Sequence, residues 1–423
     1  MKHSYQSFLS ELEFVKKYTL GVAMSRSNQE VYTPVGLAQD MLSKIPKDFW
    51  SSPKNCVMDP CVKSGIFLME SIEKFMHGLK YWEPSVEKRF KHIIENQIYG
   101  FCCSSWAHKM TNKSIFGDML YNGHIYNHQF LDFNGETSIL VKKLIKNMKF
   151  DCIIGNPPYQ TQTDGNSRPI WHLFVENSIK NLEDGGYLCY VHPSGWRNVE
   201  GAFKNVGNLI KSKDVEYLEI HDEKDGMNTF GAMTRYDWYV LKNSPSSKKT
   251  SVKFQDGSTK IIDLNALSFI PNGSYDKIVS LLSGNSGNKI NILYNCDYHH
   301  QKEYVSKEKT GKFKYPVFYC INQGDKSTIF YSSEKRGHFG ISKFIWSNGY
   351  IPSFGCVVDP KGEYGMTQFC YAIVDEPKNL DNIKKAFDSK AFRDLMFDCK
   401  MSENSLNRKV LALFRKDFYK DFI

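Results

Sequence analysis

One stretch decides the fold of this chain: Phe150-Asp151-Cys152-Ile153-Ile154-Gly155-Asn156-Pro157-Pro158-Tyr159. Its apolar run predicts a buried strand, and the Gly-Asn-Pro-Pro turn predicts that this strand stops abruptly. Each proline lacks an N–H and biases the residue before it toward extended geometry, so the loop is stiff. Open α/β sheets bind ligands at the carboxyl ends of their strands, which is where this loop is expected.

The loop carries three groups that suit the same kind of ligand. The side-chain oxygen of Asn156 and the backbone carbonyl of Pro157 are two acceptors that can converge, and Tyr159 adds an aromatic face. Two acceptors and a ring face suit an exocyclic amino group on a flat ring. The alternative is an ordinary strand-to-loop turn, in which Asn and Pro are common. By average residue usage, this tetrapeptide arises by chance in on the order of one chain in a thousand of this length.

Strand and helix patterns alternate through the rest of the first half. A short apolar run at residues 55–59 ends at an acid and a turn, and apolar residues at helical spacing follow from residue 66. Further strands are expected at residues 98–101, 114–116 and 187–191, with a helical stripe over residues 170–182. Residues 215–220 and 236–241 are expected to close the sheet as a hairpin-like pair. The predicted fold class is therefore α/β, with a doubly wound Rossmann-like sheet.

Four further motifs occur in a fixed order around the loop. They are Glu30-Val31-Tyr32-Thr33-Pro34, Val57-Met58-Asp59-Pro60-Cys61-Val62-Lys63-Ser64-Gly65-Ile66-Phe67, Ile115-Phe116-Gly117-Asp118, and the Gly185-Gly186 turn that leads to His192-Pro193-Ser194. Together with the Asn-Pro-Pro-Tyr loop, they resemble the γ-type N6-adenine-specific DNA methyltransferases of restriction-modification systems, over about residues 29–243. The second motif is similar to that family's cofactor loop, which normally reads Asp-Pro-x-x-Gly-x-Gly.

The resemblance implies a domain order and an activity. Residues 1–28 are expected to form an N-terminal extension, residues 29–243 the S-adenosylmethionine-dependent catalytic domain, and residues 244–423 an α+β target-recognition domain that binds DNA. The implied reaction moves the methyl group of S-adenosylmethionine to N6 of an adenine flipped out of double-stranded DNA. Its implied role is restriction-modification or phage/host DNA modification.

The resemblance also assigns residues to roles. Asn156 and Pro157 accept hydrogen bonds from the adenine amino group, Pro158 completes the catalytic loop, and Tyr159 stacks on the base. Phe230 is the expected second wall of the base pocket, and the alternative for it is a core residue that anchors its loop. The expected cofactor-binding residues are Tyr32, Thr33, Pro34, Asp59, Pro60, Lys63, Ser64, Gly65, Asp118 and Asn156.

The chain departs from the family pattern at two places near the cofactor. Lys63 stands where a glycine is usual, and it is either a solvated loop lysine or a partner of the cofactor's carboxylate. The second strand lacks the usual ribose-binding acid, because Cys102 and Cys103 are followed by Ser104 and Ser105. Either serine hydroxyls replace that acid or the cofactor is held more weakly.

Composition narrows the class of protein. Eleven cysteines, an odd number without paired spacing, favour a reducing cytoplasm. We expect no membrane association, since neither a signal-peptide pattern nor an apolar run of about 18 residues is evident. Cys296, His299, His300 and Cys320 invite a zinc interpretation, but a second close ligand pair is missing, so no metal is expected.

The net charge of +9 is compatible with a nucleic-acid partner. Apolar periodicity lapses over residues 243–250, which predicts a linker, and basic residues interleaved with aromatics follow it. A solvated surface is the alternative explanation for such lysines. The last apolar stretch, residues 410–418, is expected to pack rather than to recognise DNA. The basic residues are Lys302, Lys307, Lys309, Lys312, Lys314, Lys326, Lys335, Arg336, Lys343, Arg408, Lys409, Arg415, Lys416 and Lys420.

Two other functions stay open. A protein glutamine N5-methyltransferase also carries Asn-Pro-Pro-Tyr, but that class lacks the Tyr-Thr-Pro opening and a large basic C-terminal domain. A non-catalytic DNA-binding homologue is supported only by Lys63 and the missing ribose acid. The expected oligomeric state is a monomer. A fused nuclease domain is not expected, because the segment before Gln29 is too short for one, and a separate cognate restriction endonuclease is an open partner.

Overall fold

The computed structural model describes residues 4–21, 32–117, 123–161, 167–198, 200–284, 287–295, 297–322, 324, 326–348, 355–400 and 407–423. The chain divides into two compact units, Met1–Ser268 and Phe269–Ile423. This division falls later than the boundary expected after Asn243. The reason lies in the sheet of the first unit, which continues beyond that residue.

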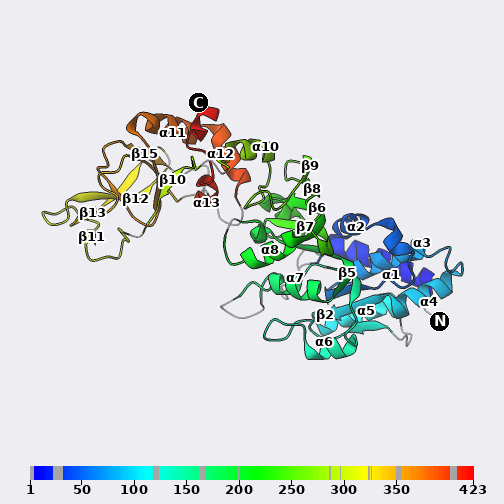
Figure 1. Cartoon of the computed structure of the whole chain (residues 1–423). Coiled ribbons are helices and arrows are strands. Elements are labelled where there is room, and N and C mark those ends of the chain that lie inside the picture. The colour runs from blue at the N-terminus through cyan, green and yellow to red at the C-terminus, as the bar shows by residue number, and fades with distance from the viewer. Residues whose placement is uncertain are drawn as a thin grey trace. The chain divides into compact units, whose positions relative to one another are not determined.

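The first unit is built on a nine-stranded sheet in the order β3-β2-β1-β4-β5-β7-β6-β8-β9 (Figure 1). β7 runs antiparallel to both of its neighbours, β5 and β6, whereas β1 to β5 pair in parallel. β8 and β9 extend the sheet past the expected linker, and β7 itself runs to Pro245. The strands are β1 (Val57–Val62), β2 (Ile98–Cys102), β3 (His124–Tyr126), β4 (Phe150–Gly155), β5 (Leu182–Pro193), β6 (Lys213–His221), β7 (Tyr236–Pro245), β8 (Thr250–Lys253) and β9 (Thr259–Ile262).

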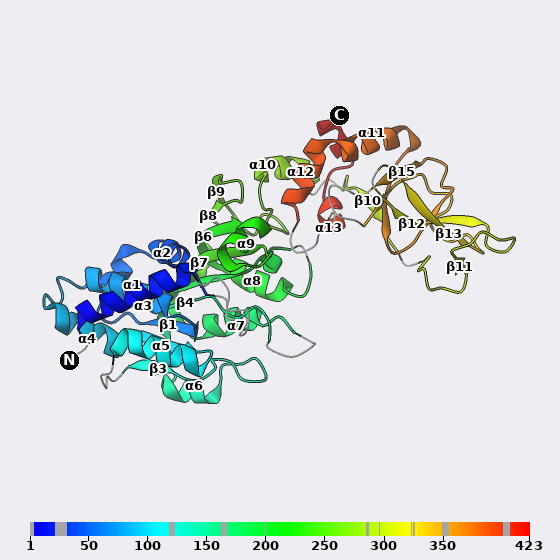
Figure 2. The ribbon, with the colours of Figure 1, turned by 180° about the vertical axis from the view of Figure 1, so that it is seen from behind.

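The strand order contains a switch point between β1 and β4. From β1 the chain proceeds outward to β2 and β3, and then returns to the other side of β1 to form β4 (Figure 2). Loops that leave the carboxyl ends of β1 and β4 therefore diverge to opposite faces of the sheet. Such a crevice is the usual ligand site of doubly wound folds.

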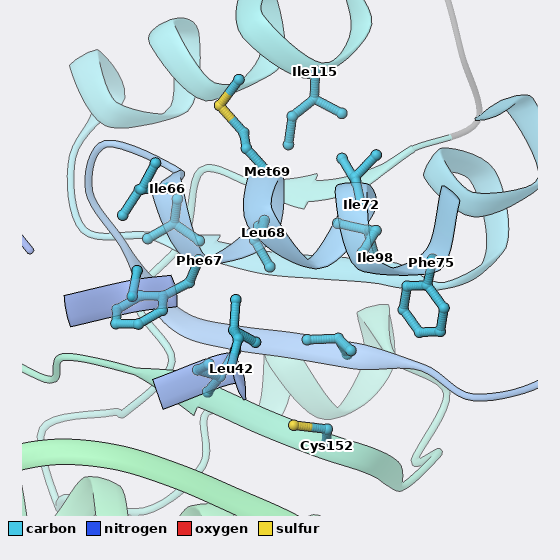
Figure 3. Close-up of a cluster of buried hydrophobic side chains, with 14 of the residues drawn as sticks. Leu42, Ile66, Phe67, Leu68, Met69, Ile72, Phe75, Ile98, Ile115 and Cys152 are labelled. Carbon is cyan, nitrogen blue, oxygen red and sulfur yellow. The ribbon is translucent and has the colours of Figure 1, made fainter. Parts of the chain in front are cut away.

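Helices cover both faces of this sheet. One face packs against α1 (Tyr5–Gly21), α2 (Val35–Ser43), α3 (Ile66–Gly78), α4 (Val86–Asn96) and α5 (Ser105–Phe116), and Figure 3 shows part of the buried cluster between them. Cys189 and Val191 of β5 point into that cluster. The alternate residue His192 faces the other side, where it stacks on Trp171 of α7 with ring centroids 4.3 Å apart.

The other helices of the first unit are α6 (Ile139–Leu144), α7 (Trp171–Lys180), α8 (Lys204–Ser212) and α9 (Glu223–Phe230), with 3-10 turns η1 (Lys47–Ser51) and η2 (Ser194–Arg197). The position of α7 agrees with the expected helical stripe. In the described part of the chain, no helix combines the length and apolar character needed to cross a membrane.

One expected strand differs from the structure. Residues 114–116 were expected to form the third strand, but they are the last turn of α5, and β3 follows at His124–Tyr126. Ser104 starts that helix early, since its Oγ accepts from the N–H of Ala107 at 3.1 Å. Gly117 ends the helix with a φ of 64°, so this glycine follows a helix rather than a strand. The hairpin-like pair of β6 and β7 is confirmed.

The second unit is mixed α and β. It has two four-stranded sheets, in the orders β10-β17-β14-β15 and β11-β13-β12-β16. Its last residues pack as expected, since Val410, Leu411, Phe414 and Phe418 are fully buried. The elements are α10 (Tyr275–Leu281), β10 (Asn291–Leu293), β11 (Val305–Ser306), β12 (Tyr315–Ile321), β13 (Ser327–Ser332), β14 (Lys343–Ser347), β15 (Cys356–Asp359), β16 (Gly365–Met366), β17 (Cys370–Val374), α11 (Pro377–Asp388), α12 (Lys390–Asp398), α13 (Arg408–Leu411) and η4 (Phe418–Asp421).

Candidate active site

The predicted catalytic and cofactor loops meet at the carboxyl edge of the sheet. β1 and β4 pair in parallel, with Val57 opposite Cys152 and Met58 opposite Ile153. The same register places Asp59 opposite Ile154, one residue before β4 ends at Gly155. Asn156 directly follows that end. β1 runs on to Val62, so Asp59 lies within the strand and not at its end.

Asn156 is held by residues from two distant segments. It is only 4% exposed. Its Nδ2 donates to the Oγ1 of Thr33 at 3.2 Å, and its backbone oxygen accepts from the Nζ of Lys63 at 3.1 Å. Because the amide nitrogen is turned toward Thr33, the Oδ1 atom is the acceptor that the side chain retains. The structure thus brings Thr33 and Asn156 together and adds Lys63, whose contact with Asn156 the sequence did not predict.

The cofactor loop is shaped by a buried acid and a glycine. The Oδ1 of Asp59 accepts from the N–H of Cys61 at 2.9 Å. Burial raises the pKa of Asp59 to about 7, although the Cys61 amide and the positive charge of Lys63 act in the opposite direction. Gly65 precedes α3 with a φ of 79°, and a Cβ on it would lie 3.0 Å from the side chain of Thr111. This position therefore requires glycine.

A small cavity lies between these loops. Its volume is about 10 Å³, and its lining includes Thr33, Asp59, Lys63, Ser64, Gly65 and Asn156. The chemistry of this lining fits the amino-acid end of S-adenosylmethionine: a carboxylate can face the cationic amino group, and the amides before α3 can face the carboxylate. The volume admits about one water, so these side chains must separate to admit the cofactor.

Tyr159 is half-buried, and its hydroxyl is buried. Among the described residues, that hydroxyl has no hydrogen-bond partner. Burial raises the pKa of Tyr159, as do the nearby Cys61 and Asp237. A half-buried tyrosine with a buried hydroxyl can offer a ring face to a base while its far end stays fixed.

A buried ion pair beside Tyr159 was not foreseen from the sequence. The Oδ2 of Asp237 accepts from the Nε of Arg197 at 2.7 Å and from the Nε1 of Trp196 at 2.9 Å. The side chains of Arg197 and Asp237 are both 0% exposed. In the described structure, the other carboxylate oxygen of Asp237 makes no hydrogen bond. Forty residues separate the pair in the chain, and no local sequence pattern links them.

Phe230 is not placed as expected. It was expected to project from a loop, but it is the last residue of α9 and is 3% exposed. Its ring packs edge-on against Tyr236, with centroids 4.9 Å apart. Gly231 ends the helix with a φ of 67°, which turns the chain away after Phe230. This geometry is that of a core anchor.

The structure describes the other expected cofactor-binding residues except Asp118. Tyr32 is half-buried and lies edge-on to Trp106, with ring centroids 6.3 Å apart. Pro34 precedes α2, and Pro60 and Ser64 are buried. Asp118 lies outside the described residues.

The hydroxyls near the missing ribose acid are already engaged. The Ser104 hydroxyl caps α5, and the Oγ of Ser105 accepts from the Nδ2 of Asn127 at 3.1 Å. Cys102, at the end of β2, is 2% exposed. Each hydroxyl accepts one hydrogen bond and keeps its own O–H, so a ribose-binding role for either serine does not require these hydrogen bonds to be exchanged.

The zinc interpretation gains no support. Cys296 lies outside the described residues. Within the part of the chain that the structure describes, His, Cys, Asp and Glu side chains form no group of three or more that could hold a metal ion.

Several basic residues of the second unit are not free to meet DNA. Lys343 is fully buried, and its Nζ forms an ion pair with Asp359 at 2.6 Å. Arg415 pairs with Asp417 and Asp421. The exposed lysines of this unit instead lie in the loops that precede, join and follow β11, β12 and β13. They are Lys302, Lys307, Lys309, Lys312, Lys314, Lys326 and Lys335.

Comparison with known proteins agrees with the motifs. Residues 89–226 match the model of the family described as Eco57I restriction-modification methylase. An uncharacterized adenine-specific methylase of Mycoplasma pneumoniae is 26% identical over 320 residues, covering 57% of this chain and 75% of that protein. Modification methylase CviBIII of Paramecium bursaria Chlorella virus NC1A is 26% identical over 235 residues, covering 53% of this chain and 52% of that protein.

The fold is also found in a solved restriction-modification enzyme. A nuclease-deletion mutant of the Type ISP enzyme LlaGI, solved with a DNA substrate mimic, superposes with a TM-score of 0.55 at 10% identity. The match covers 90% of this chain and 53% of that one. The motif order, the family match and these relatives confirm the resemblance: the chain is an S-adenosylmethionine-dependent methyltransferase related to the restriction-modification methylases.

Proposed function

We propose that this methyltransferase modifies N6 of adenine in double-stranded DNA, at a base flipped out of the helix. The observation that carries the proposal is the placement of Asn156 at the switch point. Its amide nitrogen is engaged by Thr33, so its Oδ1 remains to accept a hydrogen bond beside the cofactor loop. Adenine presents an exocyclic amino group with two hydrogens, which matches the Asn156 Oδ1 and the Pro157 carbonyl.

The two acceptors activate the amino group by orientation. When both N6 hydrogens point at Asn156 and Pro157, the nitrogen lone pair leaves conjugation with the ring and faces the other way. When bound, the cofactor would supply an electrophilic methyl group: the N6–methyl bond would form as the sulfur–methyl bond breaks, with no covalent enzyme intermediate. The methylated amino group would then release one proton to solvent. The chain contributes positioning and fixed dipoles. Tyr159 offers its ring face to the flipped base.

Asp59 and the start of α3 are proposed to hold the cofactor. The buried Asp59 carboxylate would pair with the cationic amino group, and the turn at Ser64 and Gly65 would direct backbone N–H groups at the carboxylate. Tyr32, Thr33, Pro34 and Pro60 complete the surrounding wall. A role for Asp118 in contacting the adenine of the cofactor is implied by the resemblance alone.

The second unit is proposed to recognise the DNA target. Exposed lysines alternate with aromatic rings there: the Nζ of Lys314 lies 5.3 Å from the Tyr315 ring centroid, and that of Lys335 lies 5.6 Å from that of Phe339. Such surfaces suit phosphate contacts and base stacking. The family match and the name of one relative support a modification role, for which a separate restriction endonuclease is an open partner.

Product analysis tests the proposal. The protein is incubated with tritiated S-adenosylmethionine and double-stranded DNA of mixed sequence, and the DNA is digested to nucleosides. We expect the label in N6-methyladenine. Label on cytosine would contradict the proposal, and label on a glutamine-containing peptide substrate in place of DNA would favour the glutamine methyltransferase alternative.

A further inference from the structure

Lys63 links the cofactor loop to the catalytic loop. It directly follows β1, and its Nζ donates to the backbone oxygen of Asn156, which lies 93 positions further along the chain. Its side chain is half-buried. Its charge also reaches Asp59, where it opposes the effect of burial on the pKa of that carboxyl. These contacts exclude a purely solvated loop lysine.

The peptide after Asn156 has few other means of support. Pro157 and Pro158 carry no N–H, so neither can extend the ladder of β4. The hydrogen bond from Lys63 is charge-assisted and therefore stronger than a bond between neutral groups. Fixing the Asn156 carbonyl fixes the plane of the peptide bond to Pro157. Because the proline ring also fixes φ, this plane restricts where the Pro157 carbonyl can point.

We infer that Lys63 is a positioning residue, which holds the backbone of Asn156 while Thr33 holds its side chain. The two contacts together set the Asn156 Oδ1 and the Pro157 carbonyl at the angle that the amino group requires. This inference rests on the proposed function. It also gives a role to the position at which the chain departs from the glycine usual in the family that it resembles.

Three variants of the full-length protein test the inference through kinetics. Lys63→Met keeps the length of the side chain but removes the donor, and Lys63→Arg keeps a donor. Lys88→Met, at an exposed position on α4, is the matched control. We expect Lys63→Met to lower kcat by about 10- to 100-fold, because small misplacements of reacting groups cost this much. The dissociation constant for S-adenosylmethionine should change much less than kcat, Lys63→Arg should recover most of kcat, and Lys88→Met should match the wild type.

A loss of cofactor affinity without a loss of kcat would overturn the inference. If Lys63→Met weakens S-adenosylmethionine binding in isothermal titration and leaves kcat normal at saturating cofactor, then Lys63 binds the cofactor's carboxylate. If neither quantity changes, the contact with Asn156 has no function.

A second readout does not depend on turnover. The sequence contains a single Asn-Pro bond, Asn156–Pro157, so ¹³C-carbonyl asparagine combined with ¹⁵N-proline yields one carbonyl signal in a carbon–nitrogen correlation spectrum. We expect Lys63→Met to shift this signal, Lys63→Arg to shift it less, and Lys88→Met to leave it in place. An unmoved signal in Lys63→Met would overturn the inference. If the wild type transfers no methyl group to DNA, the proposed function fails, and this spectrum still decides whether Lys63 holds Asn156.

Discussion

Asp59 shows how one buried carboxyl connects the fold to ligand binding. Its pKa in the folded protein is raised by burial from the ordinary 3.8 to about 7. The folded state therefore retains a proton that the unfolded state has released, and its stability falls as the pH rises from 3.8 to about 7. Above that range the carboxylate is ionised and buried, which is the form that a cationic ligand group would stabilise.

The pH dependence of cofactor affinity follows from this titration. We expect the affinity for S-adenosylmethionine to rise from pH 5.5 to about 7 and then to level off, because binding to the ionised Asp59 releases a proton below its pKa. The cofactor's own amino group stays protonated over this range, since α-amino groups titrate near ~8. Isothermal titration at several pH values measures the slope. Asp59→Asn should bind more weakly at pH 7.5 and show a flat profile, whereas a flat wild-type profile would contradict this role.

The pair of Arg197 and Asp237 predicts a large effect on stability. Asp237→Ala removes the buried carboxylate that accepts from Arg197, and breaking such a pair costs about 3–5 kcal/mol. Urea denaturation followed by tryptophan fluorescence measures this loss. Glu136→Ala is the control, because its pair with Lys180 is 58% exposed on both sides and surface pairs contribute little. Equal effects of the two variants would contradict the assigned importance of the buried pair.

Residues within local motifs were predictable, and long-range pairs were not. Asn156, Thr33, Asp59 and Gly65 stand in short patterns whose chemistry constrains them, and the structure places them around one cavity. The direction of the Lys63 side chain depends on a loop 93 residues away. No pattern of neighbouring residues carries that information.

At the scale of elements, most strands were predicted and their boundaries less so. Buried strands were recognised by continuous apolar runs, as in β4 and β5. Residues 114–116 look like a strand because Ile115 and Phe116 are both apolar, but the cap at Ser104 places them on the buried face of α5. The burial of Phe230 likewise depends on how α9 packs against Tyr236 of β7.

The Phe230→Ala variant distinguishes two roles for Phe230, anchoring the core and stacking on the target base. Since its ring is buried, Phe230→Ala should lower the free energy of unfolding by about 3–5 kcal/mol. Met227→Ala, at a 42% exposed position on the same helix, should have little effect. Thermal unfolding compares the two variants. If Phe230→Ala instead keeps its stability and unquenches a 2-aminopurine at the target base, Phe230 is the second wall of the base pocket.

At the scale of the whole molecule, the sequence predicted two parts but not where they divide. The lapse in apolar periodicity after Asn243 is a connection between β7 and β8, and the first unit continues to Ser268. A short edge hairpin such as β8 and β9 carries a weak apolar pattern, because one side of it faces solvent. The basic composition beyond it was visible, but the burial of Lys343 was not.

The exposed lysines of the second unit predict salt-dependent DNA binding. We expect the affinity of the full chain for double-stranded DNA to fall steeply with salt, since phosphate contacts release counterions. Replacing Lys312 and Lys314 by alanine should reduce the slope of log affinity against log salt by about 2. Fluorescence anisotropy measures both slopes, with the first-unit pair Lys88→Ala and Lys91→Ala as the control. An affinity that ignores salt would show that these lysines are only solvated surface.

In the proposed mechanism, Asn156 activates the adenine amino group through a fixed acceptor. Single-turnover methylation of double-stranded DNA by Asn156→Ala tests it most directly, with cofactor and DNA affinities measured on the same preparation. We expect a rate lower by on the order of a hundredfold or more, as for loss of other preorganised groups, while both affinities stay close to those of the wild type. A variant that methylates adenine at the wild-type rate would contradict the account.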